Sequence, residues 1–177
     1  RIEDTIVEVP DEGSRRTLES RVMKEPLMRI VCKALIDRLE DNRKGVIDLG
    51  AWKGDNAVPW ALRNPEITVY AIDPSPANTD FITAMCEANQ VQNVRVLTEA
   101  VSDSCHRLGT LHPLEHCMFT RLDHDNRDIE WTTIIMSSTL DTLHASGVIE
   151  NVGFIHLDVE GLEQPVVKGG MQLIEKF

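Results

Sequence analysis

The chain has 177 residues, a formal net charge of −11 and 42% hydrophobic residues. This length fits one domain that can bury a core without disulfides or metals. No apolar run approaches the roughly 20 residues of a membrane span, and the acidic charge disfavours a nucleic-acid substrate. The four cysteines show neither a C-x-x-C pair nor a disulfide-like spacing, which favours reduced thiols in a cytoplasmic protein.

Residues 1–44 are predicted to form an N-terminal arm and a helix. Residues 1–14 are polar apart from one short apolar patch, which is typical of an extended arm. From Pro26, apolar residues recur at helical spacing as far as Leu39, and proline suits the first turn of a helix. We expect residues 45–177 to form the main domain.

From residue 45 onward, short apolar strands alternate with helices. Ser75 is the expected cap of a helix that begins at Pro76. The buried face of that helix is predicted to carry Phe81, Ile82, Met85 and Ala88. The expected strands are 46–49, 68–72, 94–97 and 154–158, and the other expected helices are 55–63, 140–145 and 164–176. Such alternation predicts an α/β fold with a parallel sheet and right-handed crossovers.

The segment from 103 to 133 loses this alternation. Residues 108–111, 117–122 and 133–138 are typical of short antiparallel strands joined by polar turns.

The strongest local signal is a glycine-containing loop between the first strand and the next helix. It reads Asp48-Leu49-Gly50-Ala51-Trp52-Lys53-Gly54. Gly50 permits a tight turn, while the small residues Ala51 and Gly54 allow backbone to approach a ligand at the start of a helix. A dinucleotide-binding loop would instead read G-x-G-x-x-G. A strand-to-helix turn without a ligand is the alternative.

Two further polar signals follow the second and third strands. Asp73 ends the second strand, 19 residues after Gly54, where an acid can accept hydrogen bonds from both hydroxyls of a ribose. A helix-capping role before Pro74 is the alternative for Asp73. The segment that begins with Glu99 and Ala100 follows the third strand, where an adenine can lie at the carboxyl end of the sheet.

Four segments in this order resemble the FkbM family of S-adenosylmethionine-dependent methyltransferases. They read VIDLGAWKGD, AIDPSPAN, NVRVLTEAVSD and TLDTL…IHLDVEGLEQPVVKGG. The resemblance covers residues 45–176, and IHLDVEG is its most specific part. Asp73 stands where the family usually has Glu, and Trp52-Lys53 replaces a pair that is commonly Asn and a small or aliphatic residue.

The resemblance implies a Rossmann-like class I methyltransferase fold, with helices on both faces of the sheet. It also implies methyl transfer from S-adenosylmethionine to a hydroxyl of a small molecule, often a sugar or natural product. The cofactor-binding residues that it implies are Asp48, Gly50, Ala51 and Gly54 at the methionine end, Asp73 at the ribose, and Glu99 and Ala100 at the adenine.

Asp158 and Glu160 are the candidate catalytic residues. Asp158 ends the last predicted strand and Glu160 follows two residues later, so both would share one side if the extended geometry persisted. Two close carboxylates raise one another's pKa, so one of them is a candidate base for a substrate hydroxyl. The alternative is that Glu160 and Glu163 cap the helix that follows.

Four histidines and a cysteine lie close together in the sequence, which raises the question of a metal site. Pro113 and the strand-like pattern argue against a helix that would bring His112 and His116 together, so we expect no metal. The full group is His106, His112, His116, Cys117 and His124.

Two other functions stay open: a cofactor-binding fragment or scaffold without turnover, and a nicotinamide-dependent enzyme. The first is considered because family members continue with further strands, which the sequence lacks after Phe177. The strand at 154–158 would then be an apolar sheet edge. We expect a second copy of the chain to cover it, giving a homo-oligomer, with the strands of 108–138 as the alternative cover.

Overall fold

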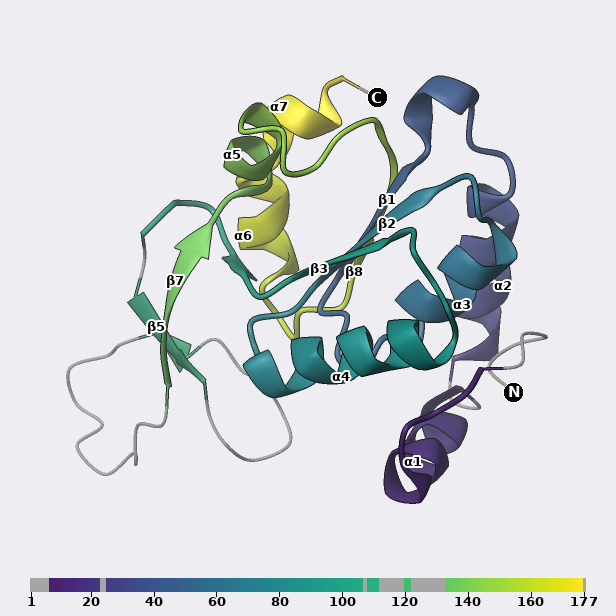
Figure 1. Cartoon of the computed structure of the whole chain (residues 1–177). Coiled ribbons are helices and arrows are strands. Elements are labelled where there is room, and N and C mark those ends of the chain that lie inside the picture. Colours follow the sequence, from purple (N-terminus) through teal and green to yellow (C-terminus); the bar gives the residue numbers. More distant parts are fainter. Residues whose placement is uncertain (1–6, 23–24, 107, 112–119, 122–132, 177) are drawn as a thin grey trace.

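The structure is a computed structural model that describes residues 7–22, 25–106, 108–111, 120–121 and 133–176. Its centre is a parallel four-stranded sheet in the order β3-β2-β1-β8 (Figure 1). The strands are β1 (Gly45–Leu49), β2 (Thr68–Ile72), β3 (Val94–Leu97) and β8 (Val152–Leu157). The predicted α/β fold with a parallel sheet is confirmed, and each predicted strand of this sheet is present within two residues of its expected bounds.

Helices cover both faces of this sheet, and each face has its own apolar core (Figure 1). The helices α3 (Ala57–Arg63) and α4 (Pro76–Ala88) pack on one face, around the fully buried Trp60. The helices α5 (Leu140–Ala145), α6 (Glu163–Lys168) and α7 (Met171–Ile174) cover the other face, where Ile47 and Ile72 are buried. All five residues of β1 are buried, as expected of a strand inside a parallel sheet.

The N-terminal part contains two helices, α1 (Glu12–Val22) and α2 (Pro26–Ile36). The extended arm predicted for residues 1–14 is wrong from Glu12 onward, because Asp11 caps a helix by accepting the Ser14 backbone N–H at 2.8 Å. Residues 1–6 of that arm lie outside the described residues. Leu18 of α1 is buried in the core beside α3, so this helix is part of the domain's packing.

Helix α2 has the predicted start at Pro26, but it ends at Ile36 and its apolar stripe faces solvent. The side chains buried against the domain are Arg29, Cys32 and Ile36. The exposed apolar residues of α2 are Leu27, Ile30, Val31 and Leu35.

Helix α4 has the predicted cap, since the Ser75 hydroxyl accepts the Asn78 backbone N–H. Two residues of its predicted buried face, Ile82 and Met85, are confirmed, and Phe81 is partly buried. Ala88 is exposed, which corrects the prediction. The buried face of α4 is formed by Thr79, Ile82, Met85 and Cys86, and Ala88 lies outside that face.

The single helix predicted for 164–176 is wrong, because α6 and α7 are separated by Gly169 and Gly170. A Cβ at Gly169 would overlap with the carbonyl oxygen of Ser102, so glycine permits the close approach of two backbones here.

A second, smaller sheet has the order β4-β7-β5-β6. Its strands are β4 (Ala100–Val101), β5 (Leu108–Leu111), β6 (Thr120–Arg121) and β7 (Thr133–Ser138). Strand β5 pairs antiparallel with β6 and β7, as predicted, while β7 pairs parallel with β4. Within the described segments, β7 therefore does not cover the β8 edge. No described helix is long and apolar enough to cross a membrane.

Candidate functional site

The loop at 50–54 is held between the ends of three strands. Gly50 and Ala51 donate their backbone N–H groups to the Ile72 carbonyl oxygen, at 2.9 and 3.1 Å. A Cβ at Gly50 would overlap with the Asp158 carbonyl oxygen, so the loop packs directly on the chain that leaves β8. Gly50 and Gly54 have φ values of +81° and +74°, which glycine adopts without strain. The helix predicted from Asp55 begins two residues later, at Ala57.

Asp73 lies beside this loop at the carboxyl end of β2. One oxygen, Oδ2, accepts the Trp52 backbone N–H at 2.9 Å, and Oδ1 accepts the Ser75 N–H and the Asn78 side-chain amide. Burial raises the pKa of Asp73, and these hydrogen bonds oppose the rise. The carboxylate therefore ties the loop to the start of α4. A carboxylate has about four acceptor positions, so three hydrogen bonds leave room for a ligand hydroxyl.

Asp48 forms a buried pair with His156, a residue that the sequence analysis did not select. The Asp48 side chain is fully buried, and its Oδ1 lies 2.9 Å from His156 Nδ1 on the neighbouring strand. Its second oxygen, Oδ2, is buried and accepts no hydrogen bond from the described residues. Burial alone would lower the pKa of His156, but the hydrogen bond and the charge of Asp48 raise it.

The Glu99 and Ala100 segment follows β3 and leads into the second sheet. Ala100 is buried in β4 opposite Ser137, while Glu99 is half-buried. Just before them, the Thr98 hydroxyl lies 2.8 Å from the Thr79 hydroxyl of α4. This contact places the segment next to the first turns of α4, on the side of the sheet that carries Asp73.

Asp158 and Glu160 are both exposed beyond the end of β8. The Asp158 N–H donates to the Leu49 carbonyl oxygen at 3.0 Å, which places this residue beside the loop at 50–54. The extended geometry does not persist, because Glu160 has a φ of +51°. Glu163, the first residue of α6, accepts the Gly161 backbone N–H at 3.2 Å with its carboxylate. This contact places a negative charge in the first turn of the helix.

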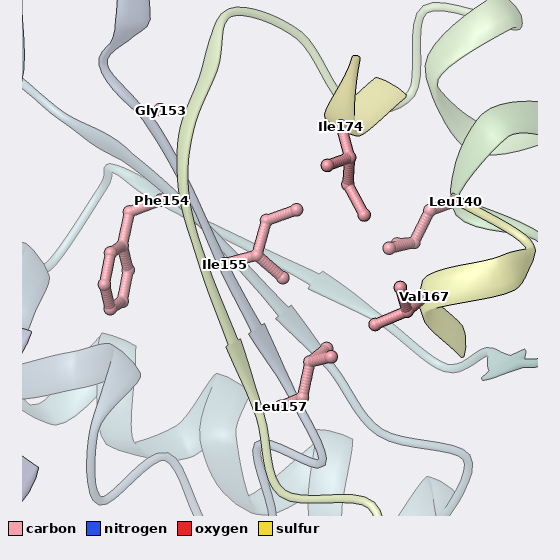
Figure 2. A pocket seen from close by; sticks show the side chains of 7 residues that line it. All are labelled: Leu140, Gly153, Phe154, Ile155, Leu157, Val167 and Ile174. Carbon is pink, nitrogen blue, oxygen red and sulfur yellow. The ribbon is translucent and has the colours of Figure 1, made fainter. Parts of the chain in front are cut away.

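An apolar groove of about 350 Å³ lies between β8 and the helices α5, α6 and α7. Figure 2 shows Ile155 and Leu157 pointing toward Val167 and the other helix residues, whereas Phe154 points to the opposite face. The residues that line the groove are Leu140, Gly153, Phe154, Ile155, Leu157, Val167 and Ile174. None of the predicted site residues lines this groove, so it is separate from the glycine loop.

The histidine cluster lies mostly outside the described residues, which include only His106 of this group. Across the described part of the chain, no three His, Cys, Asp or Glu side chains come together as a metal site.

The parallel sheet, the glycine loop after β1 and the acid after β2 define a Rossmann-like protein with the methyltransferase type of fold. A family model described as the methyltransferase FkbM domain matches residues 48–177. The chain therefore belongs to the FkbM methyltransferase family and is a methyltransferase. No curated protein sequence matches it significantly.

Proposed function

We propose that the protein transfers a methyl group from S-adenosylmethionine to a hydroxyl of a small molecule. The observation that carries this proposal is the convergence of Asp48, Asp73 and the 50–54 loop at one edge of the sheet, in a chain of the FkbM family. Acidic groups at this edge suit a donor that carries a sulfonium and an ammonium charge. A small-molecule acceptor and a cytoplasmic location are part of the same proposal.

The residues at this edge fit such a donor. Asp48 Oδ2 is a buried acceptor that the described residues leave without a hydrogen bond, as a ligand ammonium requires. Gly50 lies where any side chain would overlap with the Asp158 backbone, so its lack of a side chain lets the loop pack directly against the chain after β8. When bound, the donor supplies an electrophilic methyl carbon next to a positively charged sulfur.

In this proposal the protein binds and orients the two reactants. Asp73 accepts a ribose hydroxyl at its remaining acceptor position, and the Glu99–Ala100 segment borders the adenine. Ala51 is almost fully buried and supports the methionine end from the loop. Because the sulfonium is already reactive, alignment of the acceptor hydroxyl with the methyl carbon contributes much of the rate.

The exposed carboxylates after β8 are the candidates for proton removal from the acceptor. Asp158 lies beside the loop through its backbone and reaches solvent with its side chain. A carboxylate here accepts the hydroxyl proton as the oxygen attacks the methyl carbon. Glu160 is the second candidate, since it lies two residues after Asp158 and is also exposed.

The test of this function is calorimetric binding of S-adenosylmethionine and S-adenosylhomocysteine to wild type and Asp73→Ala. Loss of the charged acceptor should weaken binding by about 1–3 kcal/mol. Asp80→Ala on the exposed face of α4 is the matched control and should bind normally. Absence of binding to wild type, or preferential binding of NADH, would refute the proposal, and unchanged affinity in folded Asp73→Ala would refute the role of Asp73.

A further inference from the structure

The loop at 50–54, called the cofactor loop in this proposal, and the turn directly after it are held by three different parts of the chain. The Trp52 N–H is fixed by Asp73 after β2, as described above. The next residue, Lys53, donates from Nζ to the Ser14 hydroxyl of α1 at 2.9 Å. The two residues after Gly54 are then bound by Arg29 of α2, so both N-terminal helices contact the loop through side chains.

Arg29 makes the most extensive of these contacts. Its Nη2 lies 2.6 Å from Asp55 Oδ2, and its Nη1 donates to the Asp55 carbonyl oxygen at 3.0 Å and to Asn56 Oδ1 at 2.7 Å. The Arg29 side chain is only 3% exposed, and that of Asp55 is 7% exposed. The guanidinium thus fixes both the backbone and the side chains of the turn between the loop and α3.

Lys53 is also fixed in more than one direction. Besides its hydrogen bond to Ser14, its ammonium lies 4.9 Å from the centre of the Phe81 ring of α4. Ser14 is itself 6% exposed, so this contact is largely shielded from solvent. The Lys53 side chain therefore joins α1, the loop and α4.

The loop has a conformation that needs such support. Trp52 has a φ of +44°, a left-handed value that costs a residue with a Cβ about 1 kcal/mol or more. Conformations of this kind persist where surrounding contacts determine them. The contacts on Trp52, Lys53, Asp55 and Asn56 are in the right place to do this, because they lie on and directly after the left-handed residue.

We propose that α1 and α2 hold the cofactor loop in its binding conformation, with Arg29 and Ser14 as positioning residues. The proposal rests on the proposed function, since it assumes that this loop binds the methyl donor. Both residues lie before residue 48, where the match to the family model begins. The N-terminal helices would then support the cofactor site from behind the loop, since the side chains of Arg29 and Ser14 are almost fully buried.

A buried ion pair also affects folding, so the test must separate positioning from stability. Removing one partner alone strands a buried charge, whereas replacing both with uncharged residues is often neutral for stability. We therefore choose the double variant Arg29→Met/Asp55→Ala, with Arg38→Met, an exposed arginine just beyond α2, as the control. Ser14→Ala is paired with Thr17→Ala, whose hydroxyl bonds within α1 to the Gly13 carbonyl oxygen.

The test compares two quantities for each variant: the dissociation constant for S-adenosylhomocysteine and the hydrogen-exchange rate of the Trp52 amide. In the double variant we expect the dissociation constant to rise about tenfold, as is typical when a residue that supports a site is lost. The Trp52 amide should exchange faster although the urea midpoint stays close to that of wild type. Arg29→Lys keeps Asp55 and offers a point charge in place of the planar guanidinium. It should bind S-adenosylhomocysteine more weakly than wild type but more tightly than the double variant.

The outcomes distinguish this inference from the proposed function. Wild-type affinity and wild-type Trp52 exchange in the folded double variant would overturn the role of Arg29. If the double variant does not fold, Ser14→Ala decides the matter, and equal behaviour of Ser14→Ala and Thr17→Ala would overturn the proposal. If wild type does not bind S-adenosylhomocysteine, the proposed function fails, while Trp52 exchange still reports whether the N-terminal helices hold the loop.

Discussion

The pair of Asp48 and His156, on the neighbouring strands β1 and β8, is unusual because both side chains are polar and little exposed. Asp48 is fully buried, and the His156 side chain is 13% exposed beside the edge of the Trp60 ring. Each partner makes burial of the other less costly, since a carboxylate stabilises a neighbouring imidazolium. The negative charges of Asp158 and Asp55 also act on His156 and raise its pKa further.

This pair predicts a pH dependence of stability. A histidine whose pKa is raised in the folded state stabilises that state fully below its ordinary value of 6.5, and this contribution is lost as the pH rises through the raised pKa. We expect the stability of wild type relative to His156→Asn to fall over this interval. Urea unfolding between about pH 5.5 and pH 9 measures it. Asp48→Asn should also flatten the profile, and equal pH slopes in wild type and His156→Asn would contradict the prediction.

The carboxylates after β8 give a kinetic prediction. If Asp158 or Glu160 removes the hydroxyl proton, Asp158→Asn or Glu160→Gln should lower kcat strongly and leave the affinity for S-adenosylmethionine nearly unchanged. Turnover with an accepted hydroxyl substrate and calorimetry on the same preparations provide the two values. Equal losses in turnover and affinity would instead assign the residue to binding.

At the scale of elements, the conformation of the glycine loop at 50–54 depends on close contact between the chain after β1 and the chain after β8. Gly50→Ala should lower the free energy of unfolding by about 2–4 kcal/mol, because its Cβ would overlap with the Asp158 carbonyl oxygen and its φ is +81°. Gly161→Ala separates the two causes, since Gly161 has a φ of +97° but, apart from its chain neighbours, no atom of the described residues within 4 Å of an added Cβ. We expect a loss of about 1 kcal/mol there by urea unfolding. Similar losses in both variants would show that overlap at Gly50 is unimportant.

Helix α2 shows how packing can oppose the pattern of a sequence. Its strongest apolar stripe is exposed, with Leu27 at 72% and Ile30 at 64%, while the charged Arg29 is buried. The partners that make burial of Arg29 favourable are Asp55 and Asn56, in the turn before α3. A helical period therefore identified the helix but not the face that packs on the domain.

At the scale of the whole molecule, β8 is the outer strand of the main sheet among the described residues. Its backbone groups pair with β1 on one side, and the apolar groove runs along its face toward α6 and α7 (Figure 2). An edge strand next to an apolar surface is a template for pairing with another chain. We therefore keep the proposal that two copies of the chain associate at this edge.

Light scattering tests this association. We expect a dimer mass at high protein concentration and a shift toward the monomer in Val167→Glu, which places a charge at the groove. Ile30→Glu on the exposed stripe of α2 is the comparison and should leave the dimer intact. A monomeric wild type, or a dimer that is lost only in Ile30→Glu, would rule out the β8 edge as the interface.

The sequence by itself determined the strands of the main sheet, the glycine loop, the Ser75 cap and the family, because each depends on residues that are close together in the chain. Tertiary structure decided which face of α2 is buried, which residue pairs with Asp48, and where the C-terminal helix is interrupted. His156 is 108 positions from Asp48, and Arg29 is 26 positions from Asp55. No local period reports such pairs, since burial of a charge becomes favourable only when folding brings its partner within hydrogen-bond distance.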